Sequence, residues 1–199
     1  MTEGEQELYK KIGGLHSAPG RTATGYKDEE QMPSHEDFKP GTLHSIGHIL
    51  LGNYQPSQVA LPTWLNEGFG SYCEFKYFKK AGRSCISSGS KTGRTLDEGW
   101  EHGEDWQDLL KETMENEELS NFMILLNIDQ NAMTHKELAH TWSMVTFLIE
   151  DHPAKFRSLV SKLKEQGTKQ QFAIIKEVFG WSPKDFEKEW HKYLKRRKR

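Results

Sequence analysis

Two histidines and one glutamate are the residues of this chain whose types and spacing could do chemistry. His44 and His48 are four residues apart, so on an α-helix both imidazoles project from one face towards one point. Glu67 follows His48 by 19 residues. Two imidazole nitrogens and one carboxylate oxygen form a common ligand set for catalytic zinc, which leaves a fourth position for water. The three residues therefore predict a zinc site.

These ligands must lie on two neighbouring helices. The segment around Glu67 is predicted to be a helix, because Pro62 suits a first turn and apolar residues recur at helical spacing. Gly52 and Asn53 supply the end of the helix that carries the histidines. A short turn between two antiparallel helices would bring Glu67 beside the histidine pair. The recurring apolar residues of the second helix are Leu65, Phe69, Tyr72 and Phe75.

The segment from His44 to Tyr72 resembles the zinc motif of the gluzincin metallopeptidases, which include thermolysin and a family of zinc aminopeptidases. The resemblance rests on HxxxH, an 18-residue gap and NEGF. It is closer to the bacterial peptidase MA-like domains of unknown function, because residues 138–148 and 179–194 are similar to two of their later helices. The resemblance covers residues 20–195. It implies a mainly α (α+β) fold with a zincin-like metallopeptidase core.

Two catalytic groups of that family are absent. The family motif HExxH uses its glutamate as general base towards zinc-bound water, whereas this chain has Ser45. The tyrosine that stabilises the oxyanion in relatives aligns with Leu138, which donates no hydrogen bond. His140 is a candidate donor, since thermolysin-like relatives use a downstream histidine, although it lies about 200° around the helix from position 138. Ser45 could also be an engineered inactivating substitution, but this would not explain why the tyrosine is absent at position 138.

The residues around the predicted ligands also differ from the family. A metal-bound histidine usually donates its other N–H to a carboxylate or a carbonyl. Thermolysin-like relatives place an aspartate four residues after the ligand glutamate, where this chain has Ser71. Glu74, seven residues after Glu67, lies on the same helix face and is expected to take this role. Asn66 and Tyr72 flank the site.

Three functions fit these residues. The first is a zinc-binding, metallopeptidase-like domain with weak or no hydrolysis, which binds a peptide or protein segment. The second is an active zinc metallopeptidase that uses a displaced base. The third is a metal-free interaction scaffold in which the ligands are remnants. We predict the first, because both losses fall on catalytic groups while all three ligands remain.

The composition is that of a single helical domain over residues 1–199. Apolar residues make up 35% of the chain and charged residues 28%. The net charge of −2 gives no general attraction to nucleic acid, and no apolar run approaches the ~20 residues of a membrane span. The first residues lack the apolar stretch of a signal peptide, so a cytoplasmic location is expected. Cys73 and Cys85 are predicted to be free thiols.

Predictions for the remaining segments come from local patterns. Residues 21–29 alternate Thr and Tyr with other residues and predict a short edge strand. Residues 82–104 are rich in Gly and Ser and predict a flexible loop. The basic residues 195–199 predict a solvated tail, although such a cluster can also contact phosphates. The C-terminal helical bundle is expected near residues 105–117, 119–127, 134–150, 153–166, 168–179 and 183–197.

Overall fold

The computed structural model describes residues 35–55, 59–80 and 106–197. The chain divides into two compact units, Met1–Glu36 and Asp37–Arg199, and nearly all described residues belong to the second. These described residues form eight α-helices and no strand, which confirms the mainly α class. None of these helices is both long and apolar enough to cross a bilayer. The strand predicted over 21–29 and the loop predicted over 82–104 lie outside the described residues.

Two helices carry the predicted ligands, namely α2 (His35–Asn53) and α3 (Thr63–Phe78). The start of α3 follows Pro62, whose φ of −55° suits entry into a helix. Its end is Lys79, which adopts the left-handed conformation with φ 59° and donates its backbone N–H to the Phe75 carbonyl. The first helix ends at Asn53, as its Gly-Asn pair predicts. The end of α2 and the start of α3 therefore lie where the sequence predicts them.

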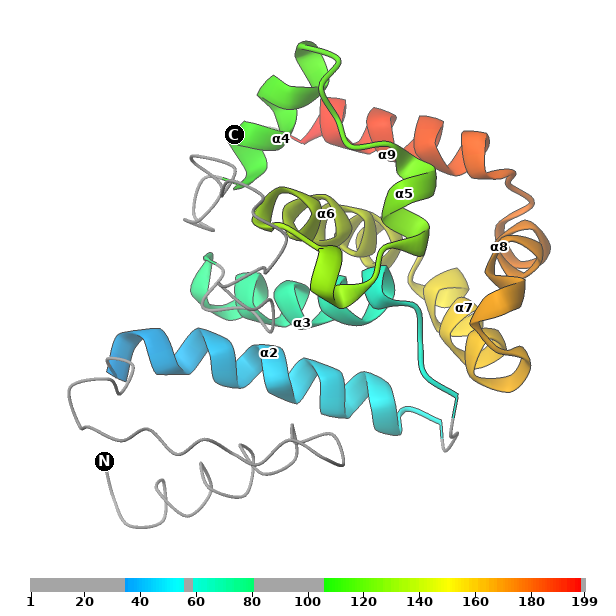
Figure 1. Ribbon diagram of the computed structural model, residues 1–199, viewed down its shortest axis with the longest axis horizontal. Helices are drawn as coiled ribbons and strands as arrows, with labels where there is room; N and C mark the ends of the chain where they lie inside the picture. Colours follow the sequence, from blue (N-terminus) through cyan, green and yellow to red (C-terminus); the bar gives the residue numbers. More distant parts are fainter. Residues whose placement is uncertain (1–34, 56–58, 81–105, 198–199) are drawn as a thin grey trace. The chain divides into compact units, whose positions relative to one another are not determined.

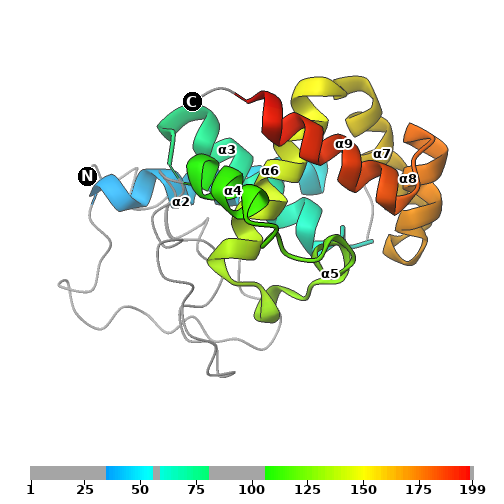
Figure 2. The same cartoon turned by 90° about the horizontal axis from the view of Figure 1, so that it is seen from above.

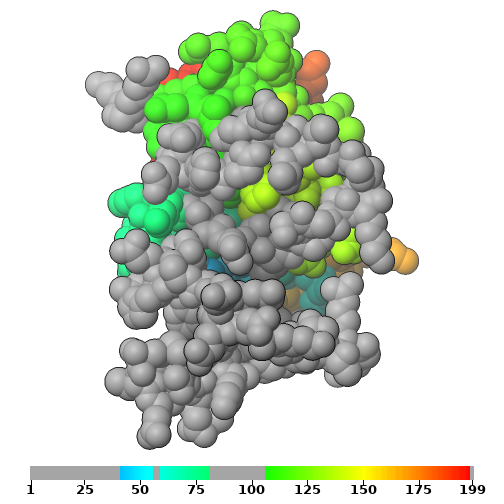
Figure 3. Space-filling view, turned by 60° about the vertical axis from the view of Figure 1, so that its left-hand side comes forward, coloured from blue at the N-terminus to red at the C-terminus, as the bar shows by residue number. Residues whose placement is uncertain are grey.

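The next three helices are α4 (Trp106–Glu115), α5 (Phe122–Asn127) and α6 (His135–Asp151). Asn121 begins α5, because its side-chain oxygen accepts hydrogen bonds from two backbone N–H groups of the first turn. Thr134 and Glu137 form a capping box at the start of α6. The helix α4 is amphipathic, with Trp106 and Leu110 buried. Its outer surface is part of the green area in Figure 3.

The last three helices are α7 (Pro153–Gln166), α8 (Gln171–Phe179) and α9 (Pro183–Arg196). Pro153 and Pro183 each occupy a first turn, where the missing N–H costs no hydrogen bond. Gly180 ends α8 in the left-handed conformation, with φ 77°. Figures 1 and 2 both show α7 and α8 side by side. The single helix predicted over 168–179 is instead a 3₁₀ turn over 168–170 followed by α8.

Lys164 holds the C-terminal end of α2 from the later helix α7. Its ammonium group donates to the carbonyl of Gly52 and, at 2.9 Å, to the carbonyl of Gln55. The last carbonyls of a helix lack intrahelical partners and carry the negative end of the helix dipole. A buried cation at this place therefore satisfies two acceptors and fixes the helix that carries both histidines.

The helix α6 is central among the described helices, because every residue from 138 to 148 is buried. It lies between α3 and α9 (Figure 1). The indole Nε1 of Trp190 in α9 donates to Ser143 Oγ at 3.0 Å, which pairs two buried polar groups. On the other side α3 approaches through Gly68, where a β-carbon would lie 2.5 Å from the Thr141 carbonyl oxygen. The missing side chain therefore sets the separation of α3 and α6.

Candidate metal centre

The three predicted ligands lie together between α2 and α3. His44 Nε2 is 3.1 Å from Glu67 Oε2, and His48 Nε2 is 3.6 Å from Glu67 Oε1. The two imidazole rings meet edge to face, with centroids 4.6 Å apart. The side chains of His44 and Glu67 are 1% and 2% exposed, and that of His48 is 13% exposed. Each residue offers one ligand atom within 4.8 Å of the others, so the group could hold a metal ion.

The Glu67 carboxylate lies about as far from each imidazole as two ligands of one metal ion lie from each other. Two ligands bound at ~2.0–2.1 Å to a tetrahedral zinc are roughly 3.3–3.4 Å apart. The contacts of Glu67 with the two histidines lie on either side of this value, at 3.1 and 3.6 Å. The carboxylate presents a different oxygen to each ring. The 3.1 Å contact is also a hydrogen-bond distance, so the buried groups can satisfy one another without a metal.

Two glycines allow α2 and α3 to approach this closely. At Gly70 a β-carbon would lie 2.8 Å from the His44 ring. At Gly47, between the two histidines, a β-carbon would lie 3.0 Å from the Gly70 Cα. These distances are below ordinary van der Waals contact between carbon atoms. The imidazole of His44 therefore lies flat against backbone that carries no side chain.

Glu74 lies behind the first histidine. Its Oε2 is 3.5 Å from His44 Nδ1, and the whole side chain is buried. When a metal is bound at Nε2, a carboxylate at this position is placed to orient the ring from the Nδ1 side. Ser71 is also fully buried, and its Oγ has no hydrogen-bond partner among the described residues. Of these two residues on the Glu67 face of α3, Glu74 is the one whose polar group lies beside the ligand.

Asn66 and Tyr72 lie on other faces of α3. Neither side chain makes a hydrogen bond to the three ligands among the residues that the structure describes. Tyr72 stacks on Phe69, with ring centroids 6.1 Å apart, and burial raises the pKa of its hydroxyl. It also lines a separate polar cavity of about 210 Å³, together with Trp142 and Arg197.

Gln130 joins the site from outside the two ligand helices, and sequence reasoning missed it. Its Nε2 donates to Glu67 Oε1 at 3.2 Å. It begins the 3₁₀ turn Gln130–Ala132, which is capped by the Asp129 carboxylate accepting from the Asn131 N–H. The Asp-x-Asn sequence marks a turn here, but no local pattern indicates which helix the turn contacts. The amide fixes the second carboxylate oxygen of Glu67.

The positions of the two missing catalytic groups are both in helices. Ser45 Oγ donates to the Gly41 carbonyl at 3.1 Å, one turn back in α2. This hydroxyl is therefore directed at its own backbone and has no basic partner there. Leu138 is fully buried in α6, and its carbonyl accepts from Thr141 Oγ1 at 2.9 Å. Neither side chain supplies a base or a hydrogen-bond donor to the ligand group.

His140 is fully buried on α6, where both ring nitrogens contact backbone groups. Its Nδ1 donates to the Lys136 carbonyl at 2.5 Å, and its Nε2 accepts from the Ser120 N–H at 3.4 Å. The ring also lies 6.0 Å from Trp190 between centroids, on the α9 side of the helix. Burial lowers its pKa to about 4, so the ring is neutral at pH 7. These contacts give His140 a place in the core.

The neutral His140 predicts a loss of stability in acid. The unfolded chain binds its proton near pH 6.5 and the folded chain near pH 4, so stability falls as the pH decreases through this window. The loss amounts to about 3 kcal/mol, because each pKa unit contributes about 1.4 kcal/mol. Urea unfolding between pH 7 and pH 4, with chelator present, measures it. A His140→Gln variant is expected to show a correspondingly flatter profile, and equal slopes in both proteins would contradict the assignment.

Comparison with protein-family models gave no match, and comparisons with curated proteins and with solved structures gave none either. The described residues show a helical structure with a buried His44, His48 and Glu67 group that could hold a metal ion.

Proposed function

We propose that this chain is a zinc-binding domain of the gluzincin metallopeptidase type that has lost its general base. Hydrolysis by such a domain is weak or absent, and its role is to bind a peptide or protein segment. The observation that carries the proposal is the buried group of His44, His48 and Glu67. Burying two imidazoles beside a carboxylate is costly unless they are paired or coordinate a metal.

The donor set favours zinc over magnesium and calcium. Two imidazole nitrogens and one carboxylate oxygen are borderline ligands, which suit zinc better than the hard oxygen cages of magnesium or calcium. The distances support this choice, since each imidazole lies 3.1 or 3.6 Å from one oxygen of Glu67 and one ligand atom of each residue lies within 4.8 Å of the others. Glu74 and Gln130 would orient His44 and Glu67 respectively.

The protein groups around the ion explain the weak chemistry. A bound zinc lowers the pKa of its water and polarises a carbonyl group. Position 45 supplies no base to take a proton there, because the Ser45 hydroxyl donates to the Gly41 carbonyl. Loss of a positioned base costs about 10²–10⁴ in rate, and loss of one oxyanion donor, at Leu138, costs about 10²–10³. What remains is a ligand-binding surface with a fixed cation.

Metal content tests the proposal directly. The protein is purified without a metal-affinity tag, and its zinc is measured by mass spectrometry beside Glu67→Ala and Glu67→Gln variants. We expect about one zinc per chain in the unaltered protein and loss of the metal in both variants, because each lacks the ligand carboxylate. Glu115→Ala, which removes an exposed carboxylate of α4, is the matched control and should keep its zinc.

The metal-free scaffold is a second candidate, favoured by one observation. Glu67 accepts from His44 at 3.1 Å and from Gln130 at 3.2 Å, so the buried carboxylate is satisfied by protein groups. Absence of zinc from every protein tested, with a melting temperature unchanged by chelator, would select this candidate and reject the zinc proposal.

A further inference from the structure

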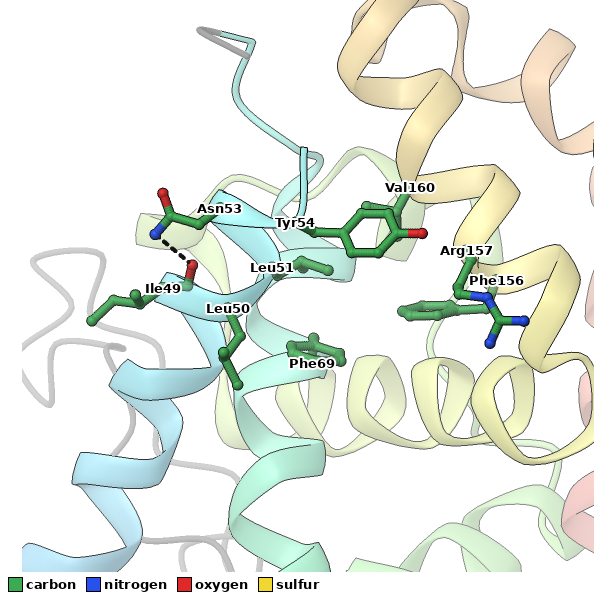
Figure 4. Close-up of a pocket in the computed structure, with 9 residues that line it drawn as sticks. All are labelled: Ile49, Leu50, Leu51, Asn53, Tyr54, Phe69, Phe156, Arg157 and Val160. Carbon is green, nitrogen blue, oxygen red and sulfur yellow. Dashed lines mark hydrogen bonds between the residues drawn. The ribbon is translucent and has the colours of Figure 1, made fainter. Parts of the chain in front are cut away.

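A cavity of about 520 Å³ lies at the C-terminal end of α2, between this helix, α3 and α7. Figure 4 shows it in close-up, with side chains of the three helices around it. No member of the metal group lines it. Phe69, its one residue from α3, follows Glu67 by two positions, which is about 200° around the helix. The cavity is therefore a feature separate from the candidate metal centre.

The interior of this cavity is almost entirely apolar. Phe69 and Phe156 stack with ring centroids 6.1 Å apart and planes 15° apart. Leu51 and Val160 are buried beside them, at 4% and 2% exposure. A volume of this size and lining falls in the range of small-molecule sites, roughly 300–1,000 Å³.

The rim leaves large apolar side chains in contact with solvent. Leu50 is 58% exposed and Tyr54 is 50% exposed, although both line the cavity. Covering them would remove apolar surface from water, which is favourable at about 25 cal/mol per Å². Binding of a ligand with an apolar body in this cavity is therefore favourable.

Arg157 gives the cavity its charge. It is exposed on α7, and it has no ion pair or hydrogen bond among the described residues. Figure 4 shows the Tyr54 ring extending from the end of α2 towards α7, where the Arg157 guanidinium lies next to Phe156. The lining contains no carboxylate, so the guanidinium is the charged group of this cavity. A guanidinium binds a carboxylate through paired N–H donors.

We propose that this cavity binds a small amphiphilic monocarboxylate, of the medium-chain fatty acid class. The apolar chain lies against Phe69, Phe156 and Val160, and the carboxylate accepts hydrogen bonds from Arg157. Charge complementarity selects an acid over a neutral lipid, and the volume selects a small molecule over a folded partner. This inference does not depend on the metal centre, since no ligand residue takes part.

Calorimetric titration of the full chain with decanoate, and separately with neutral 1-decanol, tests the proposal. We expect decanoate to bind with a negative heat-capacity change, as burial of apolar surface requires. Arg157→Gln is expected to weaken decanoate binding about tenfold and to leave 1-decanol binding unchanged, because one charge-assisted contact is lost. Lys169→Gln removes another exposed cation outside the cavity and should change neither affinity.

A second variant distinguishes a bound carboxylate from a second copy of the chain as the occupant of this cavity. Leu50→Glu places a carboxylate at the exposed rim and is expected to weaken decanoate binding by repulsion. No decanoate binding, or equal decanoate affinity in the unaltered protein and Arg157→Gln, would overturn the proposal. Sedimentation that shows a dimer dissolved by Leu50→Glu would also overturn it, and would assign this surface to a second copy of the chain.

Discussion

Replacing Gly68 by alanine is expected to destabilise the protein by about 3 kcal/mol, the upper part of the range for overpacking a core. The added β-carbon would lie 2.5 Å from the Thr141 carbonyl oxygen and 2.7 Å from Val145 Cγ2. The Thr141 oxygen belongs to the backbone of the buried helix α6, so it cannot avoid the new β-carbon by a side-chain rotation. The helices α3 and α6 must therefore move apart, and urea unfolding measures the cost.

Gly52→Ala is the matched control for this change. A β-carbon at Gly52 meets nothing within 4 Å, and the carbonyl that accepts from Lys164 is kept. We expect this variant to be as stable as the unaltered protein or more stable by up to about 1 kcal/mol, since alanine favours a helix. Equal stability of Gly68→Ala and Gly52→Ala would show that α3 and α6 are not in such close contact.

Introducing glutamate at position 45 is expected to raise peptide hydrolysis about 10²–10⁴-fold over the unaltered protein. The new carboxylate would occupy the place of the general base in the HExxH motif, next to the metal that His44 and His48 would hold under this proposal. A pool of internally quenched peptides serves as substrate, because the peptide sequence is not specified by the site. Chelator should abolish the gain.

Ser45→Gln is the control for size and shape, since its amide is not a base, and it should show no gain. Ser45→Ala removes only the hydrogen bond to the Gly41 carbonyl and should behave likewise. Strong hydrolysis by the unaltered protein that Ser45→Glu fails to increase would contradict the proposed loss of the base, and would point to a displaced one.

Much of the helical architecture follows from local sequence signals. The histidine pair, four residues apart, shares one face of α2, and the helix of Glu67 begins after Pro62 as expected. The helix predicted over 153–166 has those bounds, and the one predicted over 183–197 ends one residue earlier. Caps and prolines act within one turn, so they are visible in the sequence.

What the sequence could not supply is the distance between elements. Periodicity shows which residues share a face, but it does not show that Gly70 lies against His44. The contact of Gln130 with Glu67 spans 63 residues and has no local signature. Likewise, Cys73 is a free thiol whose pKa burial raises to about 11, while Cys85 lies outside the described residues. The family resemblance identified the three candidate ligands, whereas their neighbours Gly70 and Gln130 became visible only in the packed structure.

Gly47, Gly68 and Gly70 add three positions to the sequence pattern by which such a site can be found in other proteins. The pattern HxxxH followed by glutamate specifies the ligands alone and places no condition on how closely the two helices approach. The stricter pattern HxxGH, 18 residues, then EGxG contains Gly47, Gly68 and Gly70 together with the ligands. It encodes helix separation as well as ligand identity, and it makes no demand on position 45. Chains with and without a catalytic base would therefore be retrieved together, as one structural class.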